Sequence, residues 1–462
     1  MLCFRRFVHK TSKYAHLFPE NLFNKKHKTP AYLYVAEDQL AEQIDKAIEP
    51  FMKQTKCHTA MEINPGIGLF TNKLLNRETR IRKILLYETL EHFMPALEDL
   101  HTLYPDRVKV KQADIVSIPK LVYQDKMDNG TRVADSLCDL PKRAYSDDPI
   151  ALLFGAVGSY NFFKHLINSI IFQHGLLNFG RLEMYLAMPP PTYIHLTCNN
   201  EIGYLFYRSA SILFQILFEH RFITKLPRAQ FLPNQIDKPD KSVRLRKVNS
   251  IDRDCLYLVR IVPRRYLFDI CPQIDFLGLW YFVKQNCVSR RNRIIPNLEK
   301  WIPGCGPRLI INSRQRKTVQ LKWAEDAAIE QPKYSTLCTT MNSRDYYQRM
   351  NIFTEFGDLS PSQMLTLFRQ FRAWPEYSES SFVASLENTL LKMEVAADEN
   401  SIDIKEEDDV ASDIANDEAV EEESRKADVA KITDVNEEVA TEEVKQVVNE
   451  EAKAAKFKLK SQ

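Results

Sequence analysis

The chain has 462 residues, of which 44% are hydrophobic and 11% aromatic, enough for two or three globular domains with a sizeable core. The formal net charge of +2 hides an asymmetry, because residues 394–462 hold 22 acidic and 9 basic residues. The other 54 basic and 39 acidic residues give residues 1–393 a net charge of +15. A basic body is typical of proteins that bind polyanions, such as nucleic acid or an anionic membrane surface.

The cysteines and the apolar runs exclude two classes of protein. Nine cysteines are scattered along the chain, with no pair at CxxC spacing and no histidines at zinc spacing. We therefore expect no metal, and free thiols in a reducing compartment. No apolar run approaches the ~20 residues needed to span a bilayer, so we expect no membrane partner.

The first residues have the composition of a targeting segment. Residues 1–19 contain no acidic side chain but include Arg5, Arg6, Lys10 and Lys13, with apolar residues between them. This pattern predicts a mitochondrial targeting segment within a basic arm at residues 1–29. The alternative is an arm that contacts nucleic acid.

Strands and helices alternate from residue 35 to residue 114. Apolar residues at helical spacing predict helices, and short apolar runs that end at Gly, Pro or acidic residues predict strands. The helices are expected at about 35–55, 69–75 and 90–104, and the strands at about 59–63, 83–87 and 108–110. Alternation at this spacing indicates βαβ units around a parallel sheet.

The sheet domain is expected to continue to about residue 270. Residues 124–148 are polar and rich in turn residues, which predicts a loop or an insertion. Further strands are expected at 150–154, 181–188 and 256–262, with helices up to about 173 and at 209–218. We therefore predict an α/β domain at 30–270, a small α-helical domain at 271–393 and a disordered acidic tail at 394–462.

Three features at strand ends are candidates for a ligand site. The first is the turn from Glu62 to Gly68, where Gly66 and Gly68 would let the backbone approach a ligand closely. The second is Glu88 at the end of the next strand, where an acidic side chain can accept hydrogen bonds from ribose hydroxyls. The third is Asp114 after the third strand. Alternatively, the glycines serve only the packing of the sheet.

These residues resemble a known family. Glu62–Gly68, Tyr87-Glu88 and Ala113-Asp114-Ile115 are similar to motifs of the rRNA adenine dimethyltransferases and of their mitochondrial relatives, the transcription factor B proteins. Segments 178–184 and 357–361 look most like the fungal mitochondrial transcription initiation factors. The resemblance implies a Rossmann-like, S-adenosylmethionine (SAM)-dependent methyltransferase fold. It also implies that the cofactor would contact Glu62, Gly66, Gly68, Glu88 and Asp114.

The chain departs from the family where the target base would bind. Adenine dimethyltransferases carry Asn-(Leu/Ile)-Pro-(Tyr/Phe) after the fourth strand, and this chain has Gly155 to Asn161 there, with no Asn followed by Pro. Asn64 also replaces the first glycine of the turn, although asparagine tolerates a positive φ. We therefore expect a methyltransferase fold that is not an active enzyme, and whether SAM still binds stays open.

Basic clusters are the candidate nucleic-acid contacts. Such clusters position a protein on the phosphate backbone, whereas their alternative is a solvated basic face. The candidates are Lys238, Lys241, Arg244, Arg246, Lys247, Arg264, Arg265, Arg290, Arg291 and Arg293.

The resemblance favours one function over two alternatives. It implies a transcription initiation factor of the mitochondrial matrix and nucleoid, with the single-subunit mitochondrial RNA polymerase and promoter DNA as partners. The first alternative is a SAM-dependent dimethyladenosine transferase of mitochondrial small-subunit rRNA. The second is a ribosome-assembly or RNA-binding factor. The acidic tail is expected to be a solvated spacer, or else a DNA mimic that competes for the basic surface.

Overall fold

The computed structural model describes residues 13–24, 30–77, 80–200, 206–234, 251–311 and 350–399, with side chains as far as residue 393. All of them belong to one compact unit, Met1–Val410. Helix α16, Ser381–Glu399, enters the predicted acidic tail, and the remainder of that tail lies outside the described residues.

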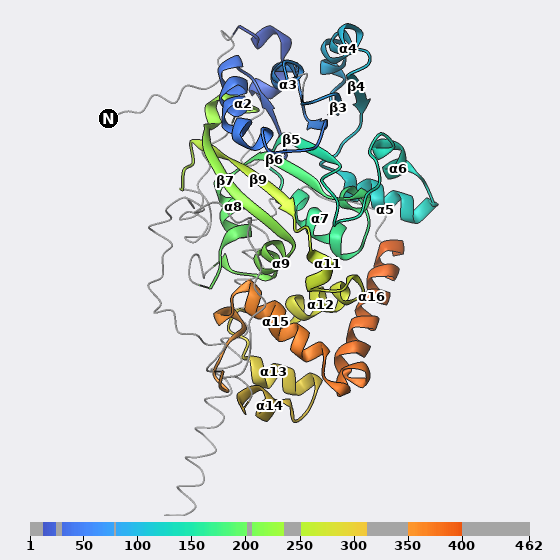
Figure 1. The fold of residues 1–462 in the computed structure, drawn as a ribbon, viewed down its shortest axis with the longest axis vertical. Helices are drawn as coiled ribbons and strands as arrows, with labels where there is room; N and C mark the ends of the chain where they lie inside the picture. Colours follow the sequence, from blue (N-terminus) through green and yellow to red (C-terminus); the bar gives the residue numbers. More distant parts are fainter. Residues whose placement is uncertain are drawn as a thin grey trace, which may run out of the picture. The chain divides into compact units, whose positions relative to one another are not determined.

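A nine-stranded sheet forms the centre of this unit (Figure 1). The main path runs β4-β3-β2-β5-β6-β9-β7, and the short strands β1 and β8 lie off it. The strands are β1 Tyr32–Val35, β2 Thr59–Ile63, β3 Lys83–Glu88, β4 Val108–Gln112, β5 Ala151–Val157, β6 Leu182–Met188, β7 Phe218–Pro227, β8 Phe231–Leu232 and β9 Cys255–Pro263.

The first five strands of the path are parallel, so their carboxyl ends share one edge. The register pairs Ile63 of β2 with Tyr87 of β3 and with Gly155 of β5. The chain order reverses between β2 and β5, which makes this point the topological switch of the sheet. Ligands of open α/β sheets bind at such a point. Strands β9 and β7 complete the sheet with antiparallel pairing.

Helices follow the strands and build the C-terminal part of the unit. Helix α2 is amphipathic and turns its buried residues, from Leu40 to Met52, toward the sheet core. The helices of eight or more residues are α2 Asp38–Met52, α4 Met94–Leu103, α5 Ile118–Asp128, α7 Tyr160–Ile171, α8 Pro190–Thr197, α9 Ser209–Leu217, α12 Phe276–Asn286, α13 Ile294–Trp301, α15 Pro361–Arg372 and α16. The shorter ones are α1 Glu20–Asn24, α3 Leu69–Leu75, α6 Arg132–Leu137, α11 Leu267–Ile270 and α14 Cys305–Ile311.

The fold class is as predicted, a Rossmann-like sheet followed by C-terminal helices. The polar segment 124–148 differs from the prediction, because α5 continues to Asp128 and α6 follows it. Polar side chains do not prevent these helices, since Asp125 accepts hydrogen bonds from the backbone amides of Arg132 and Val133 and so joins the two. Strand β1, strand β7 and the short helices at 15–24 are additions that the sequence did not suggest.

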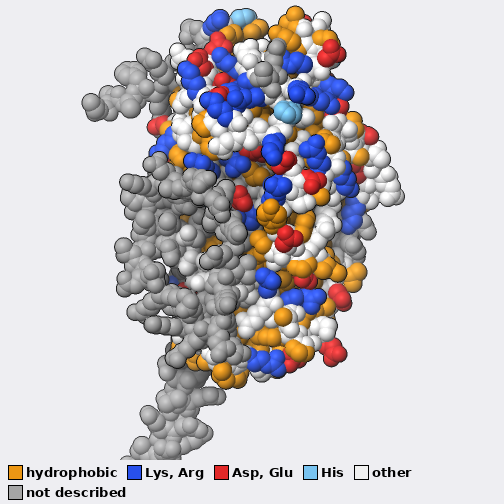
Figure 2. Space-filling view, viewed as in Figure 1, with side chains coloured by type: hydrophobic (Ala, Val, Ile, Leu, Met, Phe, Trp, Pro, Cys, Tyr) orange, Lys and Arg blue, Asp and Glu red, His pale blue; other side chains and the backbone are white. Residues whose placement is uncertain are grey.

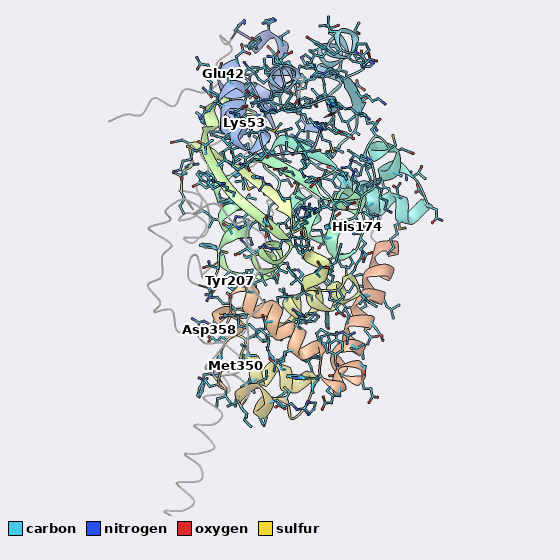
Figure 3. All side chains as sticks on the ribbon, viewed as in Figure 1. Glu42, Lys53, His174, Tyr207, Met350 and Asp358 are labelled. Carbon is cyan, nitrogen blue, oxygen red and sulfur yellow. The ribbon has the colours of Figure 1, made fainter. Side chains whose placement is uncertain are left out.

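The C-terminal helices contact the sheet part at α9, α7 and α5, and at Tyr207 just before α9. The Tyr207 hydroxyl donates to the carbonyl oxygen of Leu359 at 2.8 Å, close to Asp358 (Figure 3). Helix α15 begins at Pro361 after Ser360, whose hydroxyl accepts from the amide of Gln363. The predicted boundary near residue 270 therefore marks a change from strands to helices within one compact unit. None of the described helices is both long and apolar enough to cross a membrane.

Candidate cofactor site

The five predicted cofactor residues lie at the carboxyl edge of the parallel strands. Glu62 is in β2 and Glu88 ends β3, and the turn with Gly66 and Gly68 follows β2 directly. Asp114 comes two residues after β4. The amide of Gly66 donates to Glu88 Oε2 at 3.0 Å, so the turn and the second strand are directly joined.

The turn after β2 has the backbone shape that its glycines suggested. Asn64, Gly66 and Gly68 all have positive φ, of 55°, 59° and 76°. The replacement of the first glycine by Asn64 therefore leaves the turn intact, as expected for asparagine. A side chain at Gly68 would also meet Leu100, since its Cβ would lie 2.7 Å from Leu100 Cδ1. Position 68 thus favours glycine chiefly for its conformation, because the end of the Leu100 side chain could shift to make room.

Glu88 is fully buried, and its carboxylate receives hydrogen bonds from the surrounding backbone. Besides the amide of Gly66, the amides of Thr89 and Leu90 donate to Oε1 at 2.9 and 3.0 Å. Burial raises the pKa of Glu88, and these amides act in the opposite direction. The hydroxyl of Tyr34 is a fourth donor, at 3.4 Å.

Asp114 is held by groups on both sides. Its Oδ1 accepts from the amide of Ser117 at 3.0 Å, and its Oδ2 accepts from the hydroxyl of Tyr32 at 2.5 Å. Tyr32 and Tyr34 both belong to strand β1. The sequence reading missed these two tyrosines, because the only signal was a four-residue run of aromatic and apolar residues.

Glu62 is the second buried acid of the site, beside Glu88. The Thr71 hydroxyl donates to Glu62 Oε2 at 2.7 Å. Burial raises the pKa of Glu62 to about 8, the bond from Thr71 lowers it and the nearby Glu88 raises it. At neutral pH this carboxyl is therefore mainly protonated.

The segment after β5 is covered by β1. Tyr32 pairs with Val157 and Leu33 with Ala156, and the amide of Gly158 donates to the carbonyl of Ala31. Tyr160, a candidate for stacking on a base, is only 2% exposed and packs edge-on against His195. Its ring is therefore unavailable to a base, whereas Asn161 is exposed.

The predicted nucleic-acid residues divide into three groups. Lys238, Lys241, Arg244, Arg246 and Lys247 lie outside the described residues. Arg265, Arg291 and Arg293 are exposed, although the Arg265 guanidinium also donates to the carbonyl of Ser146. Figure 2 shows Lys and Arg side chains spread over one face of the unit, with acidic side chains between them.

Arg264 and Arg290 correct the prediction, because both are buried, at 2% and 3% exposure. The Arg264 guanidinium donates to the carbonyls of Ile216 and Gln215 at 3.0 and 2.9 Å. These are among the last carbonyls of α9, which a basic side chain can satisfy. Arg264 therefore holds the end of a helix.

Replacing Arg264 by leucine is expected to lower the free energy of unfolding by about 2 kcal/mol, because two buried carbonyls lose their donors. Urea denaturation measures the change. The matched control is Arg291→Leu, an exposed arginine whose loss should change stability by about 0.5 kcal/mol or less. Equal effects of the two substitutions would refute the assignment.

No group of three or more His, Cys, Asp or Glu side chains is placed to hold a metal ion in the described part of the chain. The seven cysteines that the structure describes are free thiols.

Comparison with known proteins identifies the family. The family model "Ribosomal RNA adenine dimethylase" matches residues 23–305. "Dimethyladenosine transferase 2, mitochondrial" of Drosophila melanogaster is 57% identical over 407 residues, covering 87% of this chain and 90% of the fly protein. The Mus musculus protein of the same name is 22% identical over 238 residues, 50% of this chain and 59% of the mouse protein.

Among solved structures, a dimethyladenosine transferase from Plasmodium falciparum aligns with a TM-score of 0.40 and 12% identity. The alignment covers 72% of this chain and 95% of the Plasmodium chain.

These matches overturn two predictions. The expectation of a transcription initiation factor is wrong, since the relative that is 57% identical is named as a dimethyladenosine transferase. The expectation of a protein that is not an enzyme is wrong for the same reason, and because the matching family is one of methylases. The partners inferred from that reading, a mitochondrial RNA polymerase and promoter DNA, stay untested predictions. The chain belongs to the ribosomal RNA adenine dimethylase family.

Proposed function

We propose that this protein is a SAM-dependent dimethyladenosine transferase that acts on ribosomal RNA in mitochondria. The observation that carries the proposal is the 57% identity to the fly dimethyladenosine transferase 2 over 90% of the length of that protein. The predicted targeting segment supports a mitochondrial location, and because residues 14–24 pack in the fold it would end before Tyr14. We infer the matrix as the compartment.

The residues at the carboxyl edge of the sheet have the chemical groups that the cofactor needs. Glu88 stands at the end of β3, where a carboxylate can accept ribose hydroxyls, and Asp114 would accept the adenine amino group. Gly66 and Gly68 would let the backbone approach the amino-acid end of the cofactor. When bound, SAM supplies an electrophilic methyl group.

The target adenine would be received at the carboxyl end of β5. This strand is the parallel neighbour of β2 at the switch point, so its end lies beside the turn that carries Gly66. The exocyclic nitrogen of the adenine would form its bond to the methyl group there as the bond from that methyl group to the SAM sulfur breaks, and it would lose one proton to water. The half-exposed Ser159 and the exposed Asn161 are the polar side chains that follow β5.

The basic surface supports RNA as the partner. Residues 1–393 have a net charge of +15, and Arg265, Arg291 and Arg293 are exposed. The Arg293 guanidinium lies over the ring of Phe353, 5.3 Å from its centre, and Phe353 is 65% exposed. An exposed aromatic ring beside an arginine is suited to an unpaired base and its phosphate.

The test is methylation of a small-subunit rRNA hairpin with adjacent adenines, using purified full chain, SAM and mass spectrometry of the digested RNA. We expect N6,N6-dimethyladenosine from the wild type and at least tenfold less from Glu88→Gln, because the amide replaces one acceptor oxygen. The control is Glu376→Gln, which breaks an exposed ion pair with Arg308 in the C-terminal helices. No product from stoichiometric wild-type protein would refute the proposed function.

A further inference from the structure

The hydroxyls of two tyrosines donate hydrogen bonds to the carboxylates that an adenosine group would need as acceptors. Strand β1 crosses the carboxyl edge of the sheet and pairs with β5 through Tyr32 and with β8 through Tyr34. Because side chains alternate along a strand, these residues point to the same side. Their hydroxyls reach Asp114 at 2.5 Å and Glu88 at 3.4 Å.

Glu88 already accepts hydrogen bonds from four donors, and three of them converge on one oxygen. The amides of Thr89 and Leu90 and the Tyr34 hydroxyl donate to Oε1, whereas Oε2 accepts from the amide of Gly66. A carboxylate oxygen offers about two lone-pair sites, so a ribose hydroxyl that binds Oε1 must displace a donor. The three amides belong to the turns after β2 and β3 and cannot leave without unfolding them. Tyr34 is the side-chain donor and makes the longest bond, so Tyr34 is the donor that a ligand would displace.

Aromatic packing covers the same turn. The Tyr34 ring lies 5.1 Å from that of Phe93, and Phe18, in the segment between η1 (Ala15–Leu17) and α1, lies 5.6 Å from Phe93. A Cβ at Gly66 would lie 3.2 Å from Tyr34 Cδ1 and 3.9 Å from Phe18 Cε1. The space beside Gly66 into which a side chain would project is thus bordered by these two rings.

The N-terminal segment is anchored at two further points. The hydroxyl of Tyr14 donates to Asp38 at 2.5 Å, and the His92 ring meets the carbonyl oxygen of Leu17 at 3.1 Å. Phe18 is 4% exposed and Phe23 is 9% exposed, so both are part of the apolar cluster around Tyr34. Residues 14–24 therefore cover β1 and the turn.

We propose that Tyr32 and Tyr34 hold the cofactor site closed by bonding Asp114 and Glu88, and that SAM competes with these two hydroxyls. This inference rests on the proposed function. Tyr32 and Tyr34 thereby set the affinity of the site, because the apparent affinity for a ligand falls in proportion to the fraction of molecules that are open. Phe18 and its neighbours stabilise the closed form by packing on the Tyr34 ring.

The test is calorimetric binding of S-adenosylhomocysteine to the full chain. Tyr32→Phe and Tyr34→Phe keep the rings and remove the hydroxyls, so the double variant is expected to bind about tenfold more tightly than the wild type. Phe18→Ala is expected to tighten binding as well. The matched control is Tyr207→Phe, which removes a buried hydroxyl bond to Leu359 and should leave the affinity unchanged.

Hydrogen exchange gives a second readout. Saturating S-adenosylhomocysteine should increase exchange in residues 14–24 of the wild type, because the ligand opens the segment that covers the turn. Unchanged or weaker binding by the double variant would overturn the inference, and so would increased protection of residues 14–24.

The outcomes separate this inference from the proposed function. Tighter binding by the tyrosine variants without any dimethyladenosine would support the closed site and refute the function. Methylation by a wild type that binds as tightly as the double variant would support the function and refute the closed site. Absence of binding in all variants would refute both.

Discussion

When the pH is raised from 5 to 7.5, the free energy of unfolding of Glu62→Gln is expected to increase by about 3 kcal/mol relative to that of the wild type. Burial raises the pKa of Glu62 from its ordinary value of 4.5 to about 8. The unfolded chain therefore releases this proton near pH 4.5, whereas the folded protein keeps it up to pH 8. Since the folded state binds the extra proton in this window, the wild type loses stability as the pH rises, and glutamine does not titrate.

Urea denaturation of both proteins at several pH values measures this difference directly. The free energy of unfolding of Glu62→Gln minus that of the wild type should be nearly constant below pH 4.5. It should grow between pH 4.5 and pH 8 and be constant above pH 8. Glu376→Gln is the control, because Glu376 is exposed and its pKa is lowered by Arg308. A difference between Glu62→Gln and wild type that does not change with pH would show that Glu62 ionises normally.

The central sheet could be predicted from the sequence because its signals are local. A parallel strand that is buried on both faces needs a continuous apolar run, and the runs before Asn64, after Arg82 and after Pro149 supply it. The helix predicted at 69–75 is α3, Leu69–Leu75. The acids at the strand ends could be placed for the same reason, since parallel strands end at a common edge.

The covering of the site could not be predicted, because it depends on partners far away in the chain. Strand β1 has four residues, and its partners β5 and β8 follow more than 100 residues later. The composition of Tyr32–Val35 is compatible with a strand, but so short a run does not show what it pairs with. Residues 14–24 lie in a stretch that was interpreted as a targeting segment. That interpretation gave no reason to expect Phe18 and Phe23 to pack in the core.

The function of a basic residue was equally hidden. Arg264 and Arg265 directly follow β9, yet the first is buried against α9 and the second, which begins a turn, is exposed. The sequence shows two adjacent arginines, but it does not show which of them will donate hydrogen bonds to the carbonyls at the end of α9.

Buried histidines are expected to make the protein labile to acid. Burial lowers the pKa of His220 to about 3, assisted by the charge of Arg264, and lowers the pKa of His165 to about 3, assisted by His174 (Figure 3). Both rings are therefore neutral in the folded protein at pH 5, whereas in the unfolded chain they become charged below about 6.5. The unfolded state binds more protons, so stability that is present above pH 6.5 is lost as the pH falls toward 3.

Each histidine should cost about 2 kcal/mol of stability between pH 7.5 and pH 5, the two together about 4 kcal/mol. Ionisation of Glu62 changes the free energy of unfolding in the opposite direction over part of this pH range. Variants of the single histidines therefore separate their contributions from that of Glu62. Against the wild type, His220→Leu and His165→Leu should each gain about 2 kcal/mol in urea denaturation on going from pH 7.5 to pH 5. His58→Leu is the control, because this ring is exposed and bonds the carbonyl of Arg80 at the surface. If all three variants respond to pH alike, the buried rings are charged in the folded protein. They would then need partners of opposite charge, and the buried Nε2 atom of His165 has no hydrogen-bond partner among the described residues.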